Sequence, residues 1–165
     1  MLKEWIIRTQ TDEGAALARD IGAAPIIGQI LWNRGMRSAE EAQTFLHPED
    51  EPFHDPFLMR DMEKAVLRIQ KAIHEGERIV VYGDYDVDGM TSTTLLMKNI
   101  RALGGMVSYY IPNRFTEGYG INGTALAQLA SEGCDLLVTV DCGISSVDVV
   151  AEMDGAMDII ITDHH

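Results

Sequence analysis

The spacing of hydrophobic and polar residues divides the chain into two parts. Residues 1–76 have the periodicity of amphipathic helices, and the predicted helices cover 11–20, 25–35, 38–46 and about 58–74. Ser38 followed by Glu41 is the capping-box pattern that begins a helix, and Gly76 is typical of a helix end. Residues 47–56 hold three prolines and four acidic residues, which indicates a surface linker. We therefore expect a helical amino-terminal region over 1–76, with a linker before its long last helix.

From residue 77 the pattern changes to short apolar runs that alternate with helical stretches. The predicted strands cover 79–82, 106–111, 135–140 and 157–161, and the helices between them cover 90–103, 123–132 and 145–153. Alternation at these lengths is typical of a parallel sheet with helices on its faces. Runs such as LLVTV are apolar on both faces, as buried parallel strands are. The predicted fold class is therefore α/β, with a Rossmann-like parallel sheet over 77–165 behind the helical leader.

Composition places the chain among globular proteins. The chain has 165 residues, of which 46% are hydrophobic and 24% are charged, enough for one ordinary α/β domain with a short leader. No apolar run approaches the ~20 residues of a membrane helix, and the first residues turn polar too early for a secretory signal. The two cysteines, Cys134 and Cys142, form neither a CxxC motif nor a disulfide framework. We expect reduced thiols, no membrane partner and a cytoplasmic location.

The net charge bears on the class of partner. Lys plus Arg is 13 and Asp plus Glu is 26, which gives −13 with neutral His. A non-specific nucleic-acid binder is usually basic, so composition alone argues against a nucleic-acid partner. A site that concentrates carboxylates to hold divalent cations would lower the net charge for a different reason. The bound cations would then restore a local attraction for phosphate.

Acidic residues and histidines follow three of the four predicted strands. Parallel strands end at one edge of their sheet, so these side chains should converge there. The residues concerned are Asp84, Asp86 and Asp88 after the first strand, Asp141 after the third, and Asp163, His164 and His165 after the last.

A metal site explains this convergence better than ordinary turns do. Asp141 alone would be read as a turn residue. Asp84, Asp86 and Asp88 at alternate positions would point the same way if the strand geometry continued, and like charges so close need cations to neutralise them. The pair His164 and His165, preceded by an acid, is typical of a ligand beside a phosphate-contacting neighbour.

Two further motifs in the sequence match known binding motifs only in part. The pattern Asp84-x-Asp86-x-Asp88-Gly89 opens a calcium-binding EF-hand loop, but the closing glutamate falls at Leu95 and a strand precedes the loop. Residues 118–123 match GxGxxG, but residues 112–117 separate them from the strand, and the loop is not the first βα turn. We expect neither an EF-hand nor a dinucleotide site.

The donor set predicts the ions and the reaction. Asp and His without cysteine suit Mn²⁺ or Mg²⁺, with zinc less favoured. Two such ions ~4 Å apart activate a water and stabilise the leaving oxygen in an in-line displacement at phosphorus. Asp88 and Asp141 are candidates to bridge both ions, and Asp86 and His164 would each complete one side. The sequence thus predicts a two-metal phosphoesterase site.

At these residues the chain resembles the DHH phosphoesterase family. DVDGMTS (86–92) is similar to its first motif, Asp141 to its second, and Asp163-His164-His165 to the motif that names the family. Within it, the nearest resemblance is to the RecJ branch of single-strand-specific 5′→3′ DNA exonucleases. The segments that carry this resemblance are LWNRGMRSAEEAQTFLHP (31–48), DPFLMRDMEKAVLRI (55–69), GDYDVDGMTS (83–92) and IPNRFTEGYGIN (111–122).

The resemblance implies a role for each site residue. Metal ligands are implied at Asp86, Asp88, Asp141 and His164. His165 would lie near the scissile phosphate.

Two acids near these ligands receive secondary roles. Asp84 would stand at the edge of the site, as a ligand or behind one. Asp163 would orient the histidines as part of the catalytic group.

For three residues outside the metal motifs, a substrate-binding role and a purely structural role both stay open. Arg114 is similar to an arginine that holds a substrate phosphate, and its other interpretation is a solvated loop residue. Tyr85 and Tyr119 would stack on bases, or would only pack.

The function implied by the resemblance is hydrolysis of single-stranded DNA in repair and recombination, within the bacterial cytoplasm. A single-strand-binding protein or a helicase would be the protein partner. Two rival interpretations stay open: a phosphoesterase of cyclic dinucleotides, short oligonucleotides or pyrophosphate, and a non-catalytic scaffold with the same fold. The family has a further metal-ligand motif and a second domain, and neither is found here. We therefore expect a truncated, amino-terminal fragment with weak or absent activity.

Overall fold

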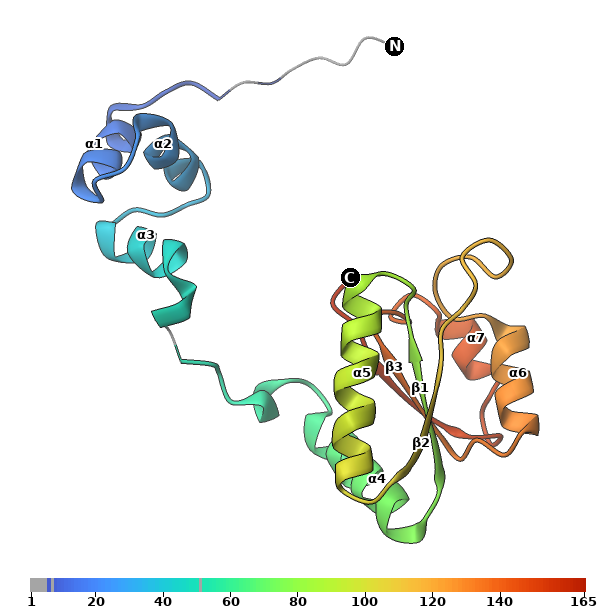
Figure 1. The fold of residues 1–165 in the computed structure, drawn as a ribbon. Coiled ribbons are helices and arrows are strands. Elements are labelled where there is room, and N and C mark those ends of the chain that lie inside the picture. Colours follow the sequence, from blue (N-terminus) through green and yellow to red (C-terminus); the bar gives the residue numbers. More distant parts are fainter. Residues whose placement is uncertain (1–5, 7, 51) are drawn as a thin grey trace, which may run out of the picture. The chain divides into compact units, whose positions relative to one another are not determined.

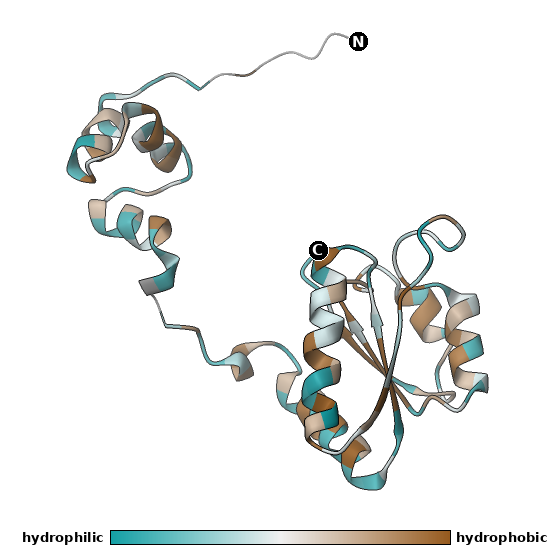
Figure 2. Ribbon diagram, in the orientation of Figure 1, coloured by the Kyte–Doolittle hydropathy of each residue, from teal (hydrophilic) through white to brown (hydrophobic). Residues whose placement is uncertain are grey.

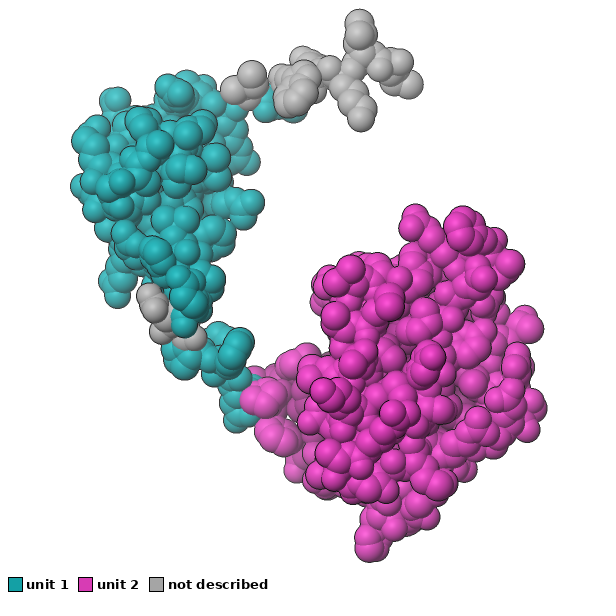
Figure 3. All heavy atoms as spheres, viewed as in Figure 1, with its two compact units in different colours: residues 1–55 teal, residues 56–165 magenta. Residues whose placement is uncertain are grey.

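The computed structural model describes residues 6, 8–50 and 52–165, and the chain divides into two compact units, residues 1–55 and 56–165 (Figure 3). The first unit is helical, as the spacing of its apolar residues predicts. Its helices are α1 (Asp12–Asp20), α2 (Pro25–Asn33) and α3 (Ala39–Leu46), followed by the short 3₁₀ turn η1 (Pro48–Asp50). The Ser38 side chain caps α3 by accepting a hydrogen bond from the Glu41 amide at 3.1 Å, so the predicted helix start is confirmed.

A small core holds the helical unit together. Leu17, Leu31 and Ala42 are buried, one from each helix. Helices α1 and α2 approach closely at Gly28, where an added Cβ would lie 2.3 Å from the Gly14 carbonyl oxygen. A side chain at Gly28 would therefore force these two helices apart.

The second unit is a four-stranded parallel sheet in the order β2-β1-β3-β4 (Figure 1). Its strands are β1 (Arg78–Gly83), β2 (Met106–Tyr110), β3 (Leu136–Val140) and β4 (Asp158–Thr162). Its helical elements are η2 (Pro56–Leu58), α4 (Met62–Glu75), α5 (Val87–Ala102), α6 (Gly123–Ser131) and α7 (Val147–Ala151). The predicted α/β class is confirmed, with each strand within two residues of its predicted bounds.

Helices cover both faces of this sheet because successive side chains of a strand point to opposite faces. Val80 and Tyr82 of β1 lie in a core with α6 and α7, whereas Ile79 and Val81 lie in a second core with α4 and α5. In Figure 1, α5 lies on one side of the sheet and α6 and α7 lie on the other. The apolar character of the sheet is visible in Figure 2.

Helix α4 belongs to the sheet unit. Ala72 is fully buried against the sheet, and Ile69 and Ile73 pack beside it. Arg68 forms ion pairs of 2.6 Å with Glu77, before β1, and with Asp158, at the start of β4. The boundary expected from the sequence, between 76 and 77, assigns this helix to the leader, whereas the compact units divide between 55 and 56. Among the described residues, no helix is long and apolar enough to cross a membrane.

Candidate metal centre

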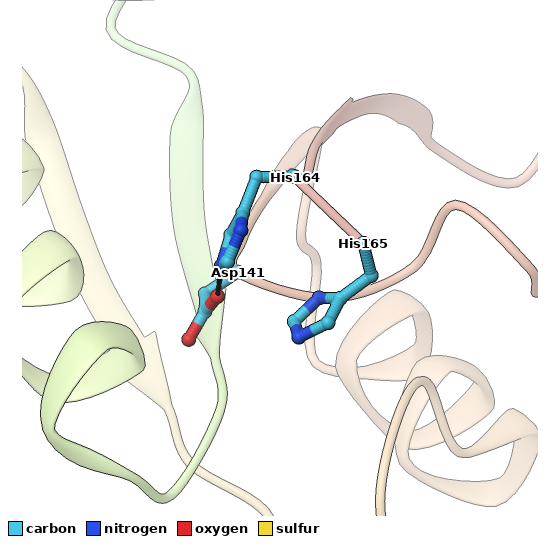
Figure 4. Close-up of side chains that lie close together, drawn as sticks. All are labelled: Asp141, His164 and His165. Carbon is cyan, nitrogen blue, oxygen red and sulfur yellow. Dashed lines mark hydrogen bonds and ion pairs between the residues drawn. The ribbon is translucent and has the colours of Figure 1, made fainter. Parts of the chain in front are cut away.

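The carboxyl ends of β1, β3 and β4 bring acids and histidines together at one edge of the sheet. Asp84, Asp86 and Asp141 form one group in which the potential ligand atoms lie within 4.8 Å of one another. Asp141, His164 and His165 form a second group by the same measure. Figure 4 shows His164 directed at the Asp141 carboxylate, with the His165 ring beside it. Asp141 is common to both groups, so the two candidate cation positions share one ligand.

The turn from β1 into α5 places the first acids. Strand β1 ends at Gly83, and the Asp86 carboxylate caps α5 by accepting hydrogen bonds from the amides of Asp88, at 2.9 Å, and Gly89, at 3.0 Å. These amides lower the pKa of Asp86, the Gly89 amide most. An added Cβ at Gly89 would lie 2.4 Å from the Asp84 carbonyl oxygen, so this close turn requires glycine.

Strand geometry does not continue through the three acids, so the condition under which their carboxylates would point the same way is not met. The chain has left the strand at Asp84, and Asp88 already lies in the first turn of α5. Among the described residues, Asp88 joins neither group of potential ligands. It lines a groove together with Asp141 and His164 instead. The structure thus brings together Asp84, Asp86, Asp141, His164 and His165, and leaves Asp88 at the margin.

Asp141 is held in an unusual backbone conformation. Its φ is +63°, in the left-handed region that few residues other than glycine adopt. Its amide donates to the Thr162 carbonyl at 3.0 Å, which ties the end of β3 to the end of β4. One carboxylate oxygen, Oδ1, lies 2.8 Å from His164 Nε2. The other, Oδ2, is buried and has no hydrogen-bond partner among the described residues.

Asp84 is the most buried acid of the centre, with 3% of its surface exposed. Burial raises the pKa of Asp84, the Tyr85 amide lowers it, and the nearby charges of Asp86 and Asp141 raise it further. Its Oδ1 also lacks a hydrogen-bond partner among the described residues. A buried carboxylate oxygen without a donor costs free energy, and a cation would remove that cost. Carboxylate and imidazole donors fit a hard divalent ion such as Mn²⁺ or Mg²⁺.

Asp163 orients the second histidine. Its Oδ1 lies 2.7 Å from His165 Nδ1 and accepts hydrogen bonds from the amides of His164 and His165, while Oδ2 accepts from the Ile144 amide at 3.0 Å. Burial alone would raise the pKa of Asp163, but these donors outweigh it and lower the pKa to about 2. The hydrogen bond to Asp163 raises the pKa of His165, which favours its cationic form. A cationic imidazole at this edge would attract a phosphate.

Three residues outside the metal motifs also lie near this edge. The Arg114 guanidinium lies over the Tyr85 ring, with Cζ 5.3 Å from its centroid. The Tyr119 hydroxyl lies 3.2 Å from His165 Nδ1, and the two rings meet edge to face at 5.8 Å. Sequence reasoning does not predict the contact between Tyr119 and His165, because two helices and two strands (α6, β3, α7 and β4) separate the two residues along the chain.

Comparison with known proteins agrees with this geometry. Residues 78–165 match the model of the DHH family, N-terminal domain. The single-stranded-DNA-specific exonuclease RecJ of Bacillus subtilis is 41% identical over 163 residues, which cover 98% of this chain and 21% of that protein. RecJ of Escherichia coli is 38% identical over 160 residues, which cover 96% of this chain and 27% of that protein. The chain therefore spans about a fifth to a quarter of the length of these relatives.

Solved structures with the same fold contain divalent cations. An exonuclease RecJ bound to manganese matches with a TM-score of 0.63 and 37% identity, over 69% of this chain and 29% of that chain. RecJ of Thermus thermophilus in complex with Mn²⁺ matches with a TM-score of 0.61 and 28% identity, over 93% of this chain and 21% of that chain. A Mg²⁺ complex of the same protein has a TM-score of 0.52.

Proposed function

The chain belongs to the DHH family, and from that premise we propose that it carries the cation-binding part of a 5′→3′ exonuclease that hydrolyses single-stranded DNA. One observation carries the proposal: two buried carboxylate oxygens, Asp84 Oδ1 and Asp141 Oδ2, have no hydrogen-bond partner among the described residues, and both residues belong to the cluster of potential ligands. The names of the relatives supply the substrate, and their bacterial origin supports the proposed bacterial cytoplasm. A role in DNA repair and recombination is proposed as a use for such an exonuclease.

We assign the ligands as follows. Asp84 and Asp86 would hold one Mn²⁺ or Mg²⁺ ion, His164 would hold the other, and Asp141 would bridge the two. Asp88, which lines the groove with Asp141 and His164, is the proposed second bridging ligand. Two bound divalent ions supply an activated water and charge stabilisation at phosphorus.

The chain's own side chains would bind and orient the DNA. His165, held at Nδ1 by Asp163, would present Nε2 to a non-bridging oxygen of the scissile phosphate and neutralise charge there. Arg114 would bind a neighbouring phosphate with its planar guanidinium. The pairing of His164 Nε2 with Asp141 Oδ1 at 2.8 Å would give way when a cation takes that oxygen.

Two measurements test this proposal. Calorimetric titration of the chain with MnCl₂ should show two sites, and Asp141→Asn should lose both because it removes the shared ligand. Asp88→Asn should keep one site if Asp88 joins only when the second ion binds. The absence of any Mn²⁺-dependent heat would refute the metal centre and favour a non-catalytic scaffold.

Hydrolysis separates the enzymatic alternatives. An oligonucleotide labelled at either end should release mononucleotides from its 5′ end in Mn²⁺, at the low rate expected of a chain with weak activity, and Asp141→Asn should abolish this release. A duplex of the same sequence should resist cleavage. Faster hydrolysis of a dinucleotide or a cyclic dinucleotide than of the oligonucleotide would contradict the exonuclease assignment and favour a small-substrate phosphoesterase.

A further inference from the structure

The loop between β2 and α6, residues 111–122, is fixed to the sheet by two tyrosines. The Tyr110 hydroxyl donates a hydrogen bond of 2.6 Å to Glu117 Oε1, and Glu117 Oε2 accepts one of 2.7 Å from the Asn113 amide. This pair of bonds clamps the first half of the loop, because Glu117 has both oxygens engaged. The bond to Glu117 also raises the pKa of Tyr110 to about 12, so its proton stays in place at neutral pH.

The second half of the loop is held by Tyr82 of β1, which is fully buried. Its ring stacks on Tyr110 with the centroids 5.2 Å apart, and its hydroxyl donates to the Gly120 carbonyl at 3.2 Å. The same hydroxyl accepts a hydrogen bond from the Asn122 amide at 3.3 Å. Loops of this length are often mobile, whereas this one is hydrogen-bonded to the sheet at three positions, Glu117, Gly120 and Asn122.

The outer side of this loop carries aromatic and cationic groups. Phe115 is 94% exposed, and its amide donates to Asn113 Oδ1 at 2.9 Å, which fixes the turn on which it stands. Arg114 precedes it and lies over Tyr85, the residue after the buried Asp84. Tyr119, 54% exposed, contacts His165 of the metal centre. The loop projects beyond the end of the sheet, near the edge that carries the centre (Figure 1).

We infer that Phe115 is a base-stacking residue, which receives a nucleobase of a single strand whose phosphate is held by Arg114. The inference rests on the proposed function and deepens it by naming what selects the single-stranded form. The solvent-exposed phenyl ring on a fixed loop presents an apolar face for stacking. A nucleobase can stack on it only when the base is not already stacked within a double helix. Arg114 is the only Lys or Arg in the loop, so it gives a defined register between phosphate and base.

Binding of a 3′-fluorescein 12-nucleotide strand, followed by anisotropy in Mn²⁺ with phosphorothioate linkages to slow cleavage, tests this inference. Phe115→Ala should weaken binding roughly 10-fold, and Phe115→Trp should restore it, because the loss comes from a stacking face. Phe53→Ala is the matched control, since Phe53 is fully exposed in the helical unit. Glu117→Ala should also weaken binding, because it releases the loop while Phe115 remains.

A strand with abasic sites at successive positions from its 5′ end provides the decisive comparison. At one position, loss of the base should weaken binding by the parent chain and leave Phe115→Ala unaffected, since the stacking partner is already absent. Equal affinity of the parent chain and Phe115→Ala for the intact strand would overturn the inference. If the parent chain cleaves single strands and that equality holds, only this inference fails; if it neither binds nor cleaves them, the proposed function fails with it.

Discussion

Replacing Asp84 by Asn should have opposite effects on stability without and with a divalent cation. In the metal-free chain, Asp84 is buried beside Asp86 and Asp141, with potential ligand atoms within 4.8 Å of one another. Two like charges at that separation repel by about 1 kcal/mol in a medium of ε ~80 and by about 3.5 kcal/mol at ε ~20. A neutral amide at this position would remove the repulsion, so we expect the metal-free variant to be more stable than the parent chain by about 1–3 kcal/mol.

The pH dependence of this effect follows from the raised pKa of Asp84. A carboxyl whose pKa is higher in the folded than in the unfolded chain favours folding while it is protonated, below its ordinary value near 3.8. That contribution is lost as pH rises through the folded pKa. The advantage of Asp84→Asn should therefore be small near pH ~3.5 and fully developed at pH ~7.

Thermal unfolding followed by circular dichroism measures both halves of the prediction. For a unit the size of residues 56–165, 1 kcal/mol corresponds to a shift in Tm of roughly 3–6 °C. In EDTA at pH 7, Asp84→Asn should raise Tm. In MnCl₂ at about 100 times Kd, the parent chain should gain about 2.7 kcal/mol, and the variant should gain much less because one ligand is missing.

A control and a refuting result can be stated for the same experiment. Asp154→Asn changes an exposed acid shortly after α7 and should move Tm little under either condition. A lower Tm for Asp84→Asn in EDTA would show that hydrogen bonds to the carboxylate outweigh the repulsion. An Mn²⁺-dependent rise in Tm equal to that of the parent chain would remove Asp84 from the ligand set.

Three further expectations concern stability and reactivity. Asp163→Asn should destabilise the folded chain at pH 7 by about 2 kcal/mol, since the pKa of Asp163 is lowered to about 2. The difference in stability should persist above pH ~4 and disappear as the pH falls towards 2. Urea unfolding at a series of pH values measures it. Gly89→Ala should cost roughly 2 kcal/mol or more in the same assay and abolish Mn²⁺ binding by calorimetry, because the new Cβ would strike the Asp84 backbone. Burial raises the pKa of Cys134 to about 11 and that of Cys142 to about 12, so iodoacetamide at pH 8 should label neither thiol until the chain is unfolded, as read by mass spectrometry.

Most helices and strands of the fold are predictable because the spacing of their apolar residues matches the period of a helix or a strand. The strand β3, for example, is buried at every position, and its sequence LLVTV has no polar face to mislead a prediction. The sequence pattern places the start of α5 at residue 90 instead of Val87, because Asp88 and Gly89 in the first turn resemble a loop. The cap that begins it, Asp86, carries the signal, but the same residue is equally well interpreted as a ligand.

The candidate site is predictable to the extent that topology alone determines it. Parallel strands end at one edge, so Asp84, Asp141 and His164 have to meet once the strands are known. The position of Asp88 is not predictable in this way, since it depends on where the strand ends and the helix begins. The exposed Phe115 gives no signal either, because its role follows from hydrogen bonds that hold a loop between distant residues.

The left-handed backbone of Asp141 limits which amino acids this position can accept. Its conformation suits Gly, Asn and Asp and strains longer side chains, whereas the proposed role as a ligand shared by two cations calls for an anionic oxygen. Glu would keep the charge but carry the strain and an extra methylene, and Asn would fit the backbone but lose the charge. Aspartate alone satisfies both conditions. Asp141→Glu, an exchange that most protein surfaces tolerate, would therefore be as damaging here as removal of the carboxylate.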